Sequence, residues 1–535
     1  MKITTFQVLL ISIFIRFLLE ILFPSMYGDN YLQIHSFTNF INGKELSLNY
    51  VLHDDLSDIK YSLLNLWPFG FVCMVYPFYK VLNSIEGSIL LLNTFFIVLF
   101  YYSIYKIVIR CLNNLDEHLK LTILLFFSVS IMPFRYMGTT DLWCLALLFF
   151  SVYLAIELIV VYELSQLRKL FYAGLIILSV SLMVTLRYTY WLLAFSSPSL
   201  LLIYGLFISR KIKKFSILIF TLSILFSIIY VLIHYSYFGK INPTSLKIQN
   251  GIQWSALKVF NPIIFNSLYR DSIVRSFFMR FFSDPFGIYL FQILAHLFGI
   301  LVIIPMISLF KKFTLKLKYN FSPTIGREIT VFIVASLIIV FINCGTIILS
   351  ALKYGYLMIT ELYPMGYTAV AEVRYFAPTL ILAFIIVVIT LGYSKNKLYK
   401  HFLKAVILSG FLFSFFVNII FLFSRFERPL LSDVHKYIHS SKSNEVFFSF
   451  LKNSKENYVF LGSPYTDLTD YYMAKKAMVP DIQGSSWNNL ELKSTKPLTV
   501  ITMIDQNDLI LEKYEYKVEI QSIKPNIDLV SFRVD

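Results

Sequence analysis

Residues Phe215–Tyr235 read FSILIFTLSILFSIIYVLIHY and contain no Asp, Glu, Lys or Arg. An α-helix of about 20 such residues is roughly 30 Å long, which matches the hydrocarbon core of a bilayer. Four basic residues directly precede the run, at positions 210, 211, 213 and 214. The stretch therefore predicts a transmembrane helix whose amino-terminal end faces the basic side of a membrane.

Ten further apolar runs along the chain are also long enough to be predicted as transmembrane helices. Hydrophobic residues make up 57% of the 535 residues and charged residues only 15%, against about 25% in soluble domains. We therefore predict an α-helical polytopic membrane protein with about 11 transmembrane helices. The other ten predicted spans are Thr5–Phe23, Gly87–Ile109, Leu121–Phe134, Asp141–Val161, Phe171–Leu186, Trp191–Ile208, Pro285–Phe310, Thr330–Ser350, Phe376–Leu391 and Ala405–Phe423.

The run Leu63–Leu82 is apolar enough to span, but it contains Pro68, Gly70 and Pro77. If it lies along the interface, nearly all basic loop clusters fall on the same side as the amino terminus. If it spans, all but the first of these clusters move to the other side. The positive-inside rule therefore favours the interfacial interpretation and a cytoplasmic amino terminus.

This topology divides the chain into two predicted domains. Residues 1–424 form the membrane domain, with outer loops 24–86, 237–284 and 351–375. Residues 425–535 form a small extracytoplasmic α/β domain, with buried strands expected at Tyr458–Leu461 and Leu498–Met503 and exposed strands at Glu515–Ile520 and Asp528–Val534. A helix is expected at Asp467–Lys476. This domain holds 14 Lys and Arg against 15 Asp and Glu, so the net charge of +15 resides in membrane loops and does not indicate nucleic-acid binding.

The first outer loop contains two groups of carboxylates. Asp29 follows the first span directly, where partial desolvation raises the pKa of a carboxyl group towards that of a usable base. Farther along lie His53, Asp54, Asp55 and Asp58. Both groups can be solvated loop charges. The second group can also bind a divalent cation, with Asp54 and Asp55 as candidate ligands, although its spacing matches no specific metal motif.

Three polar residues touch the predicted outer ends of spans. Asp141 opens the fourth span, where an acidic residue can simply cap the helix. Arg187 ends the fifth span and Arg374 opens the tenth, next to Tyr375. Outer cations against apolar spans break the positive-inside pattern. They can be snorkelling side chains, or they can bind a phosphate through the planar guanidinium fork.

The order of these short motifs resembles a known family. Gly28-Asp29-Asn30-Tyr31 follows the first helix, Leu66-Trp67-Pro68-Phe69-Gly70 precedes the second and Thr140-Asp141 opens the fourth. Leu186-Arg187-Tyr188 ends the fifth and Val373-Arg374-Tyr375 opens the tenth. This order resembles the GT-C superfamily of membrane glycosyltransferases, in particular the bacterial relatives of protein O-mannosyltransferase and lipid A aminoarabinose transferase. Here Asn30 stands where the family often has a second acid.

The resemblance implies a glycosyltransferase, inverting by direct displacement, in a bacterial cytoplasmic membrane. Its donor would be a polyprenyl-phosphate sugar and its acceptor a glycan, a lipid or a protein. Asp29 maps to the catalytic base, and Asp141 is a second catalytic candidate. Arg187, Arg374 and Tyr375 are candidates for binding the donor phosphate. A polysaccharide polymerase or ligase and a lipid-glycan flippase or other transporter stay open as alternatives.

Overall fold

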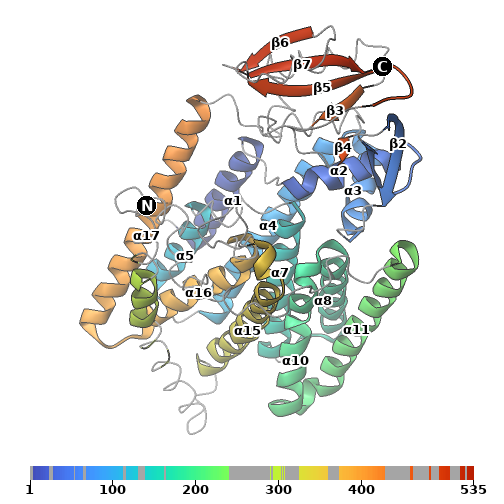
Figure 1. The fold of residues 1–535 in the computed structure, drawn as a ribbon. Coiled ribbons are helices and arrows are strands. Elements are labelled where there is room, and N and C mark those ends of the chain that lie inside the picture. Colours follow the sequence, from blue (N-terminus) through green and yellow to red (C-terminus); the bar gives the residue numbers. More distant parts are fainter. Residues whose placement is uncertain are drawn as a thin grey trace. The chain divides into compact units, whose positions relative to one another are not determined.

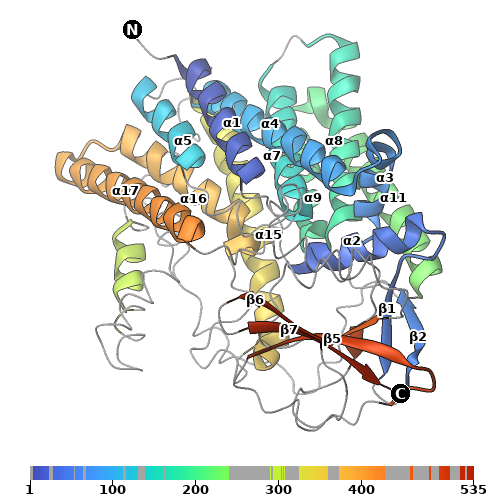
Figure 2. The same cartoon turned by 90° about the horizontal axis from the view of Figure 1, so that it is seen from above.

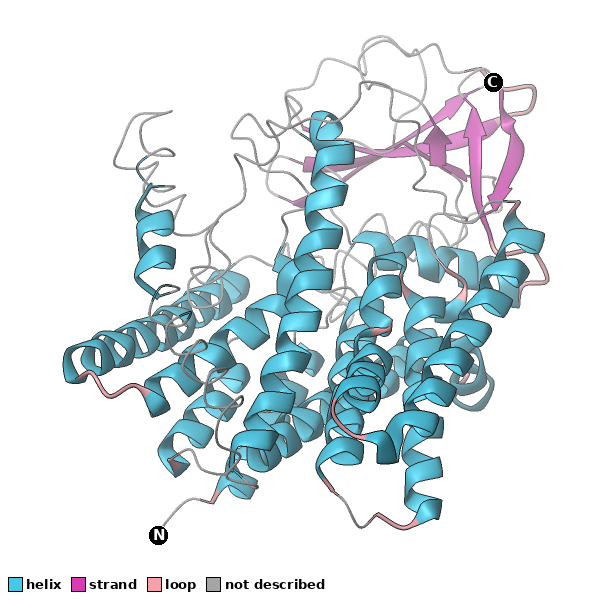
Figure 3. Ribbon diagram, turned by 90° about the horizontal axis from the view of Figure 1, so that it is seen from below, coloured by secondary structure: helices cyan, strands magenta, loops and turns pink. Residues whose placement is uncertain are grey.

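The computed structural model describes residues 4–22, 28–52, 55–63, 68–112, 116–129, 139–161, 164–239, parts of 290–307, 325–358, 373–427, 458–461, 481–483, 493–505, 519–524 and 527–534. The chain divides into two compact units. The first comprises Met1–Glu20, Pro68–Gly70 and Leu91–Ser424 and holds most of the described helices (Figure 1). The second comprises Ile21–Trp67, Phe71–Leu90 and Arg425–Asp535 and holds the described strands (Figure 3).

Long apolar sequences form the helices of the first unit, and polar or glycine residues set several of their ends. The Ser165 side chain accepts the amide of Arg168 at the start of α8, and Gly239 ends α11 in a left-handed conformation, at φ 68°, that suits glycine. The helices are α1 (Thr5–Leu22), α4 (Ile85–Cys111), α5 (Glu117–Val129), α7 (Thr139–Val160), α8 (Gln166–Leu186), η1 (Tyr188–Tyr190), α9 (Trp191–Ala194), α10 (Ser196–Phe207), α11 (Arg210–Phe238), α15 (Ile325–Met358), α16 (Val373–Tyr393) and α17 (Lys397–Glu427).

Six segments among the described residues are long and apolar enough to cross a membrane, so the chain is a multi-pass membrane protein by length and composition. They are Gly87–Cys111, Thr140–Val160, Gln166–Leu186, Tyr188–Phe207, Ile212–Phe238 and Glu328–Ile347, and they match six of the predicted spans. The prediction of about 11 spans is not confirmed. Shorter apolar helices cover Thr5–Leu18, Gly70–Leu82, Ile293–Val302 and Ala377–Gly392, and α5 has only 13 residues.

Helix α7 is the centre of the first unit. In its most apolar window 83% of the residues are buried, against 28% in α11, because α8, α10 and α15 all pack against α7 (Figures 1 and 2). Its Trp143 donates from Nε1 to Oδ1 of Asn93 on α4, at 2.8 Å, and stacks on Phe96. The polar end of a buried indole is thereby satisfied inside the bundle. Helix α11 leaves a broad apolar face exposed, as expected of a lipid-facing helix.

The second unit is built on one seven-stranded sheet, together with α2 (Gly28–Ile41) and α3 (Gly70–Leu82). Its strands are β1 (Ser47–Leu52), β2 (Asp55–Leu63), β3 (Tyr458–Leu461), β4 (Asp481–Gln483), β5 (Leu498–Asp505), β6 (Glu519–Lys524) and β7 (Ile527–Val534). Their order in the sheet is β2-β1-β4-β3-β5-β7-β6. The central pairs β1–β4, β4–β3 and β3–β5 are parallel, and the outer pairs are antiparallel.

The sheet differs from the expected division at residue 425. Strands β1 and β2 come from the first predicted outer loop, and β1 pairs in parallel with β4 from the carboxy-terminal region. Strand β3 matches its expected range. Strand β6 overlaps the expected strand Glu515–Ile520 at its last two residues, and the first four expected residues lie outside the described part of the chain. Helix α15 continues through Met358, so the predicted loop 351–375 begins inside a helix. The expected helix Asp467–Lys476 and nearly all of loop 237–284 lie outside the described residues.

Candidate functional site

A buried ion pair joins two of the residues singled out from the sequence. Arg187 donates from Nε to Oδ1 of Asp141 at 2.8 Å and from Nη2 to Oδ2 at 2.9 Å. The Arg187 side chain is 6% exposed and that of Asp141 1%. Two parallel hydrogen bonds between a guanidinium and a carboxylate fix both groups in one geometry. The structure thus brings together a candidate catalytic acid and a candidate phosphate-binding cation.

Local backbone geometry explains why these residues meet. Asp141 lies in the first turn of α7, where a negative charge interacts favourably with the helix dipole. Arg187 caps the carboxyl end of α8 with an extended backbone, at φ −153° and ψ 124°, and its amide still bonds the Met183 carbonyl. Because α7 and α8 pack as antiparallel neighbours, the start of α7 and the end of α8 lie at one end of the bundle.

A second polar pair lies at the same end of the bundle. The hydroxyl of Tyr188 is 2.9 Å from Nε2 of His234, which is fully buried on α11. The imidazole stacks on Phe69 and contacts the rings of Tyr230 and Phe238. Sequence reasoning missed this pair. The available signals were the position of Tyr188 directly after Arg187 and the single ionisable residue near the end of an otherwise apolar run.

Gly70 holds the Pro68–Gly70 turn against this end of the bundle. A Cβ atom at residue 70 would clash with the carbonyl and side chain of Thr185, in the last turn of α8. Only glycine permits so close an approach of the two backbones. The approach brings Phe69 onto the His234 ring, so Pro68–Gly70, the described part of the Pro- and aromatic-rich motif, packs beside the Tyr188–His234 pair.

The connection between α8 and α10, together with the first turn of α10, contains buried hydroxyl groups with no hydrogen-bond partner among the described residues. They belong to Thr189, Tyr190, Ser196 and Ser197. Tyr190 is 2% exposed, and Asp141 and Arg187 act electrostatically on its hydroxyl. Buried hydroxyls in proteins are nearly always paired with protein or with another polar molecule. The Tyr190 hydroxyl is therefore a candidate contact for a polar ligand beside the Asp141–Arg187 pair.

Several predicted site residues lie only partly within the described structure. Asp29 is the second residue of α2, and Arg374 and Tyr375 are the second and third residues of α16. For these three residues the structure gives the helix and not the side chain. Asp54 lies outside the described residues. The predicted roles of these residues stay predictions.

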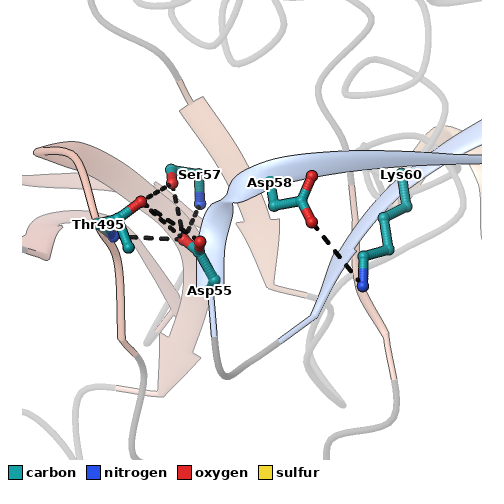
Figure 4. Close-up of polar contacts among 5 residues, drawn as sticks. All are labelled: Asp55, Ser57, Asp58, Lys60 and Thr495. Atoms are coloured by element: carbon teal, nitrogen blue, oxygen red, sulfur yellow. Dashed lines mark hydrogen bonds and ion pairs between the residues drawn. The ribbon is translucent and has the colours of Figure 1, made fainter.

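Asp55 is held by hydrogen bonds from its own turn and from the carboxy-terminal region (Figure 4). Its Oδ1 accepts the Ser57 hydroxyl at 2.7 Å, the Ser57 amide at 3.0 Å and the Thr495 amide at 3.3 Å. The Ser57 hydroxyl is the main cause that lowers the pKa of Asp55 from 3.8, followed by the Ser57 amide. Asp58 instead pairs with Lys60 at the surface, at 3.9 Å.

The predicted cation site at Asp54 and Asp55 stays a prediction, because Asp54 and the neighbouring His53 lie outside the described residues. The Asp55 carboxylate is occupied by hydroxyl and amide donors, and no group of three or more His, Cys, Asp or Glu side chains gathers among the described residues. Calcium and magnesium require several oxygen ligands around one point. Asp55 acts in this structure as a clamp between the β1–β2 hairpin and residues 493–496.

No protein-family model and no curated protein matches this sequence. A search of solved structures finds ArnT from Cupriavidus metallidurans bound to undecaprenyl phosphate. That match has a TM-score of 0.48 and 10% identity, over 94% of this chain and 92% of that chain. The apo state of ArnT is also found, with a TM-score of 0.42, 12% identity and 97% coverage of both chains. Both TM-scores lie below 0.5, so the case for a function rests on the side chains described above.

Proposed function

We propose that this chain is a GT-C-type membrane glycosyltransferase. It transfers a sugar from a polyprenyl-phosphate donor to a glycan, lipid or protein acceptor at the outer face of a bacterial cytoplasmic membrane. The observation that carries the proposal is the buried Asp141–Arg187 pair, with the Tyr190 hydroxyl beside it and without a hydrogen-bond partner among the described residues. A cation held rigidly at the end of a membrane helix suits an anion that is anchored in the bilayer by its lipid tail.

The charge pattern of the bundle supports an outward position for this pair. Helix α8 begins with Arg168 and Lys169 and ends at Arg187, and α11 begins with four basic residues and ends near His234. Arg110, at the last turn of α4, pairs with Glu157 near the last turn of α7, at the opposite end from Asp141. Under the positive-inside rule the end rich in Lys and Arg faces the cytoplasm. The Asp141–Arg187 end then faces outward, where a lipid-linked sugar and an envelope acceptor meet.

In the proposed reaction the acceptor hydroxyl oxygen attacks the anomeric carbon of the donor. The bond from that carbon to the phosphate oxygen breaks, and its electron pair leaves with the lipid phosphate. Asp29 accepts the proton of the acceptor hydroxyl. Arg187, together with Arg374 and Tyr375, stabilises the charge on the departing phosphate. A single displacement of this kind inverts the anomeric configuration.

The hydrogen bonds of Asp141 support a positioning role for this residue. Both of its carboxylate oxygens accept hydrogen bonds from Arg187, so it is poorly placed to accept a proton from a substrate. This favours Asp141 as the residue that positions Arg187, with Asp29 as the base. A divalent cation has no step in the proposed mechanism.

The test compares lipid-linked sugars and envelope glycans in a strain that lacks the protein with those of its parent strain. Loss of one sugar decoration, with build-up of its polyprenyl-phosphate donor on the outer leaflet, is the expected result. Build-up of a lipid-linked glycan on the inner leaflet would instead identify a flippase. Loss of chain length, with the repeating unit unchanged, would identify a polymerase.

A further inference from the structure

Helix α2 carries a row of buried polar groups that the proposed reaction does not use. Gln33 is 3% exposed, and neither Oε1 nor Nε2 of its side chain has a hydrogen-bond partner among the described residues. Ser36 is 1% exposed, and its hydroxyl also has no hydrogen-bond partner among the described residues. Asn39 is fully buried and donates from Nδ2 to the Ser47 carbonyl at 2.6 Å, while its Oδ1 accepts no hydrogen bond from the described residues.

The Asn39–Ser47 bond shows that this helix is not loosely placed. It ties the last turns of α2 to the start of β1, and Phe37 packs edge-on against Tyr79 of α3 at 5.6 Å. Thr38, on the same helix, satisfies its own hydroxyl by donating to the Ile34 carbonyl at 2.9 Å. The partnerless groups on α2 are therefore specific to the positions of Gln33, Ser36 and Asn39, in a helix whose other contacts are well formed.

The chemistry of these groups identifies the class of ligand that would satisfy them. A buried carboxamide is nearly always hydrogen-bonded, and Gln33 offers both donors and an acceptor. Its complement is a neutral group that both accepts and donates, such as neighbouring hydroxyls of a sugar. A phosphate is a poor complement, since it only accepts at neutral pH and α2, which reads GDNYLQIHSFTNFI, contains no Lys or Arg. A phosphate would also leave the side-chain oxygens of Gln33 and Asn39 unpaired, because it offers them no hydrogen-bond donor.

Helical periodicity relates these groups to the proposed catalytic base. Positions 29, 33 and 36 are spaced i, i+4 and i+7, so they share one face of α2. At 1.5 Å of rise per residue, positions 29 and 33 are about 6 Å apart along the helix axis. That spacing is comparable to the width of one pyranose ring. A sugar whose anomeric carbon is attacked near position 29 would extend its ring hydroxyls along this face.

We propose that Gln33 is the residue that recognises the transferred sugar, with its carboxamide hydrogen-bonded to ring hydroxyls and Ser36 as a second contact. This assignment rests on the proposed function. It adds that α2 recognises the sugar of the donor. Gln33 is a specificity residue for the sugar. Its loss should therefore affect binding of the glycosylated lipid and not of the bare lipid phosphate.

The experiment uses the full chain in nanodiscs and a lipid extract of its own host's membranes. Mass spectrometry identifies the polyprenyl-phosphate sugar that the unaltered protein retains. Affinities are then measured for this lipid and for bare undecaprenyl phosphate. The retained lipid should bind more tightly than the bare lipid. Gln33→Met, which keeps the size of the side chain and removes its hydrogen bonds, should abolish that preference, weakening the glycosylated lipid about tenfold.

The same variant should bind bare undecaprenyl phosphate as well as the unaltered protein does, and its melting temperature should not fall. Thr38→Val is the matched control, because its hydroxyl is satisfied within α2, and it should keep the full preference for the glycosylated lipid. If Gln33→Met does not fold, Gln33→Asn replaces it in the same binding comparison. Asn keeps the carboxamide but moves it one carbon away from the ligand.

The outcomes separate the two proposals. A preference for the glycosylated lipid that survives in Gln33→Met, or in Gln33→Asn where that variant decides, would overturn sugar recognition by Gln33. The proposed function would still stand in that case. Failure of the unaltered protein to retain any polyprenyl-phosphate sugar would overturn the proposed function, and sugar recognition with it.

Discussion

Arg187 donates two parallel hydrogen bonds, 2.8 and 2.9 Å long, to the two carboxylate oxygens of Asp141 inside the helix bundle. Removal of one member of a buried ion pair leaves the other charge without its counter-ion and costs about 3–5 kcal/mol. We therefore expect Asp141→Asn and Arg187→Gln each to lower the thermal stability of the detergent-solubilised protein. The double variant should lose clearly less than the sum of the two single losses.

Melting curves of the four proteins measure this coupling. Arg168→Gln is the control, because this exposed cation lies in the first turn of the same helix α8 and should change stability by less than about 0.5 kcal/mol. Strictly additive losses in the double variant would show that the two side chains do not form the pair in the folded protein.

Arg187 should also control use of the lipid-phosphate donor. Loss of a hydrogen bond to a charged group costs about 1.5–3 kcal/mol, so Arg187→Ala should lower kcat/KM for the donor by roughly 10- to 150-fold. Arg187→Lys should recover only part of the loss, because an ammonium cannot reproduce the planar guanidinium fork. The same series at Arg374 tests the second predicted phosphate contact. Unaltered donor kinetics in both Ala variants would remove these arginines from the site.

The buried hydroxyl of Tyr190 gives a test of the phosphate site that does not disturb the ion pair. If the hydroxyl donates to the phosphate, Tyr190→Phe should weaken the binding of undecaprenyl phosphate about tenfold. Its melting temperature should not fall, because the hydroxyl has no partner within the described structure. Tyr204→Phe, at a buried tyrosine near the far end of α10, is the matched control. Equal affinities in all three proteins would leave the Tyr190 hydroxyl without a role in binding.

The parts of the structure that sequence predicted best are those that depend on local composition. Long apolar runs located α7, α8 and α11 closely, because a bilayer imposes a minimum length and polarity on each crossing helix. Arg187 and Asp141 were each conspicuous, since a charge at the end of an apolar span is costly. Their pairing was not predictable, because 46 residues separate them and only the packing of α7 on α8 joins them.

The mixed origin of the sheet was hidden for the same reason. Asp55 and Thr495 are 440 residues apart, and the parallel pair β1–β4 has no turn that would mark it in the sequence. Alternating residues in Ser47–Leu52 were compatible with a loop as well as with a strand. Gln33 was overlooked because a lone amide in a short helix carries no charge or motif. Its burial without a partner becomes visible only in the folded chain.

Acid should weaken the hydrogen bonds by which Asp55 joins the β1–β2 hairpin to residues 493–496. Its folded pKa lies below the unfolded value of 3.8, so its contribution to stability is complete above pH 3.8 and disappears as the pH falls through the lower folded pKa. The amide of Leu56 donates to the Lys493 carbonyl at 2.9 Å and reports on the clamp. Hydrogen exchange at Leu56 should quicken in acid, beyond the intrinsic pH effect, and at neutral pH in Asp55→Ala. Asp58→Asn, at the neighbouring surface pair, should leave it unchanged.

The last prediction concerns Asp29 as the catalytic base. Asp29→Asn keeps the size of the side chain but cannot accept the proton of the acceptor hydroxyl, so turnover should fall about 10²–10⁴-fold. Asp29 is the second residue of α2, and loss of a charge in the first turn of a helix should cost less than about 1 kcal/mol of stability. Affinity for the donor should persist, because phosphate and sugar recognition are assigned to other residues.

Turnover and donor affinity are measured on the same preparations, with Asp55→Asn, Asp58→Asn and Asp141→Asn beside Asp29→Asn. Asp58→Asn should retain full turnover, because this surface carboxylate pairs only loosely with Lys60. Asp141→Asn should weaken donor binding through Arg187, which distinguishes a positioning residue from a base that acts on turnover alone. A well-folded Asp29→Asn variant with full turnover, alongside an inactive variant at Asp55 or Asp141, would move the base to that other carboxylate.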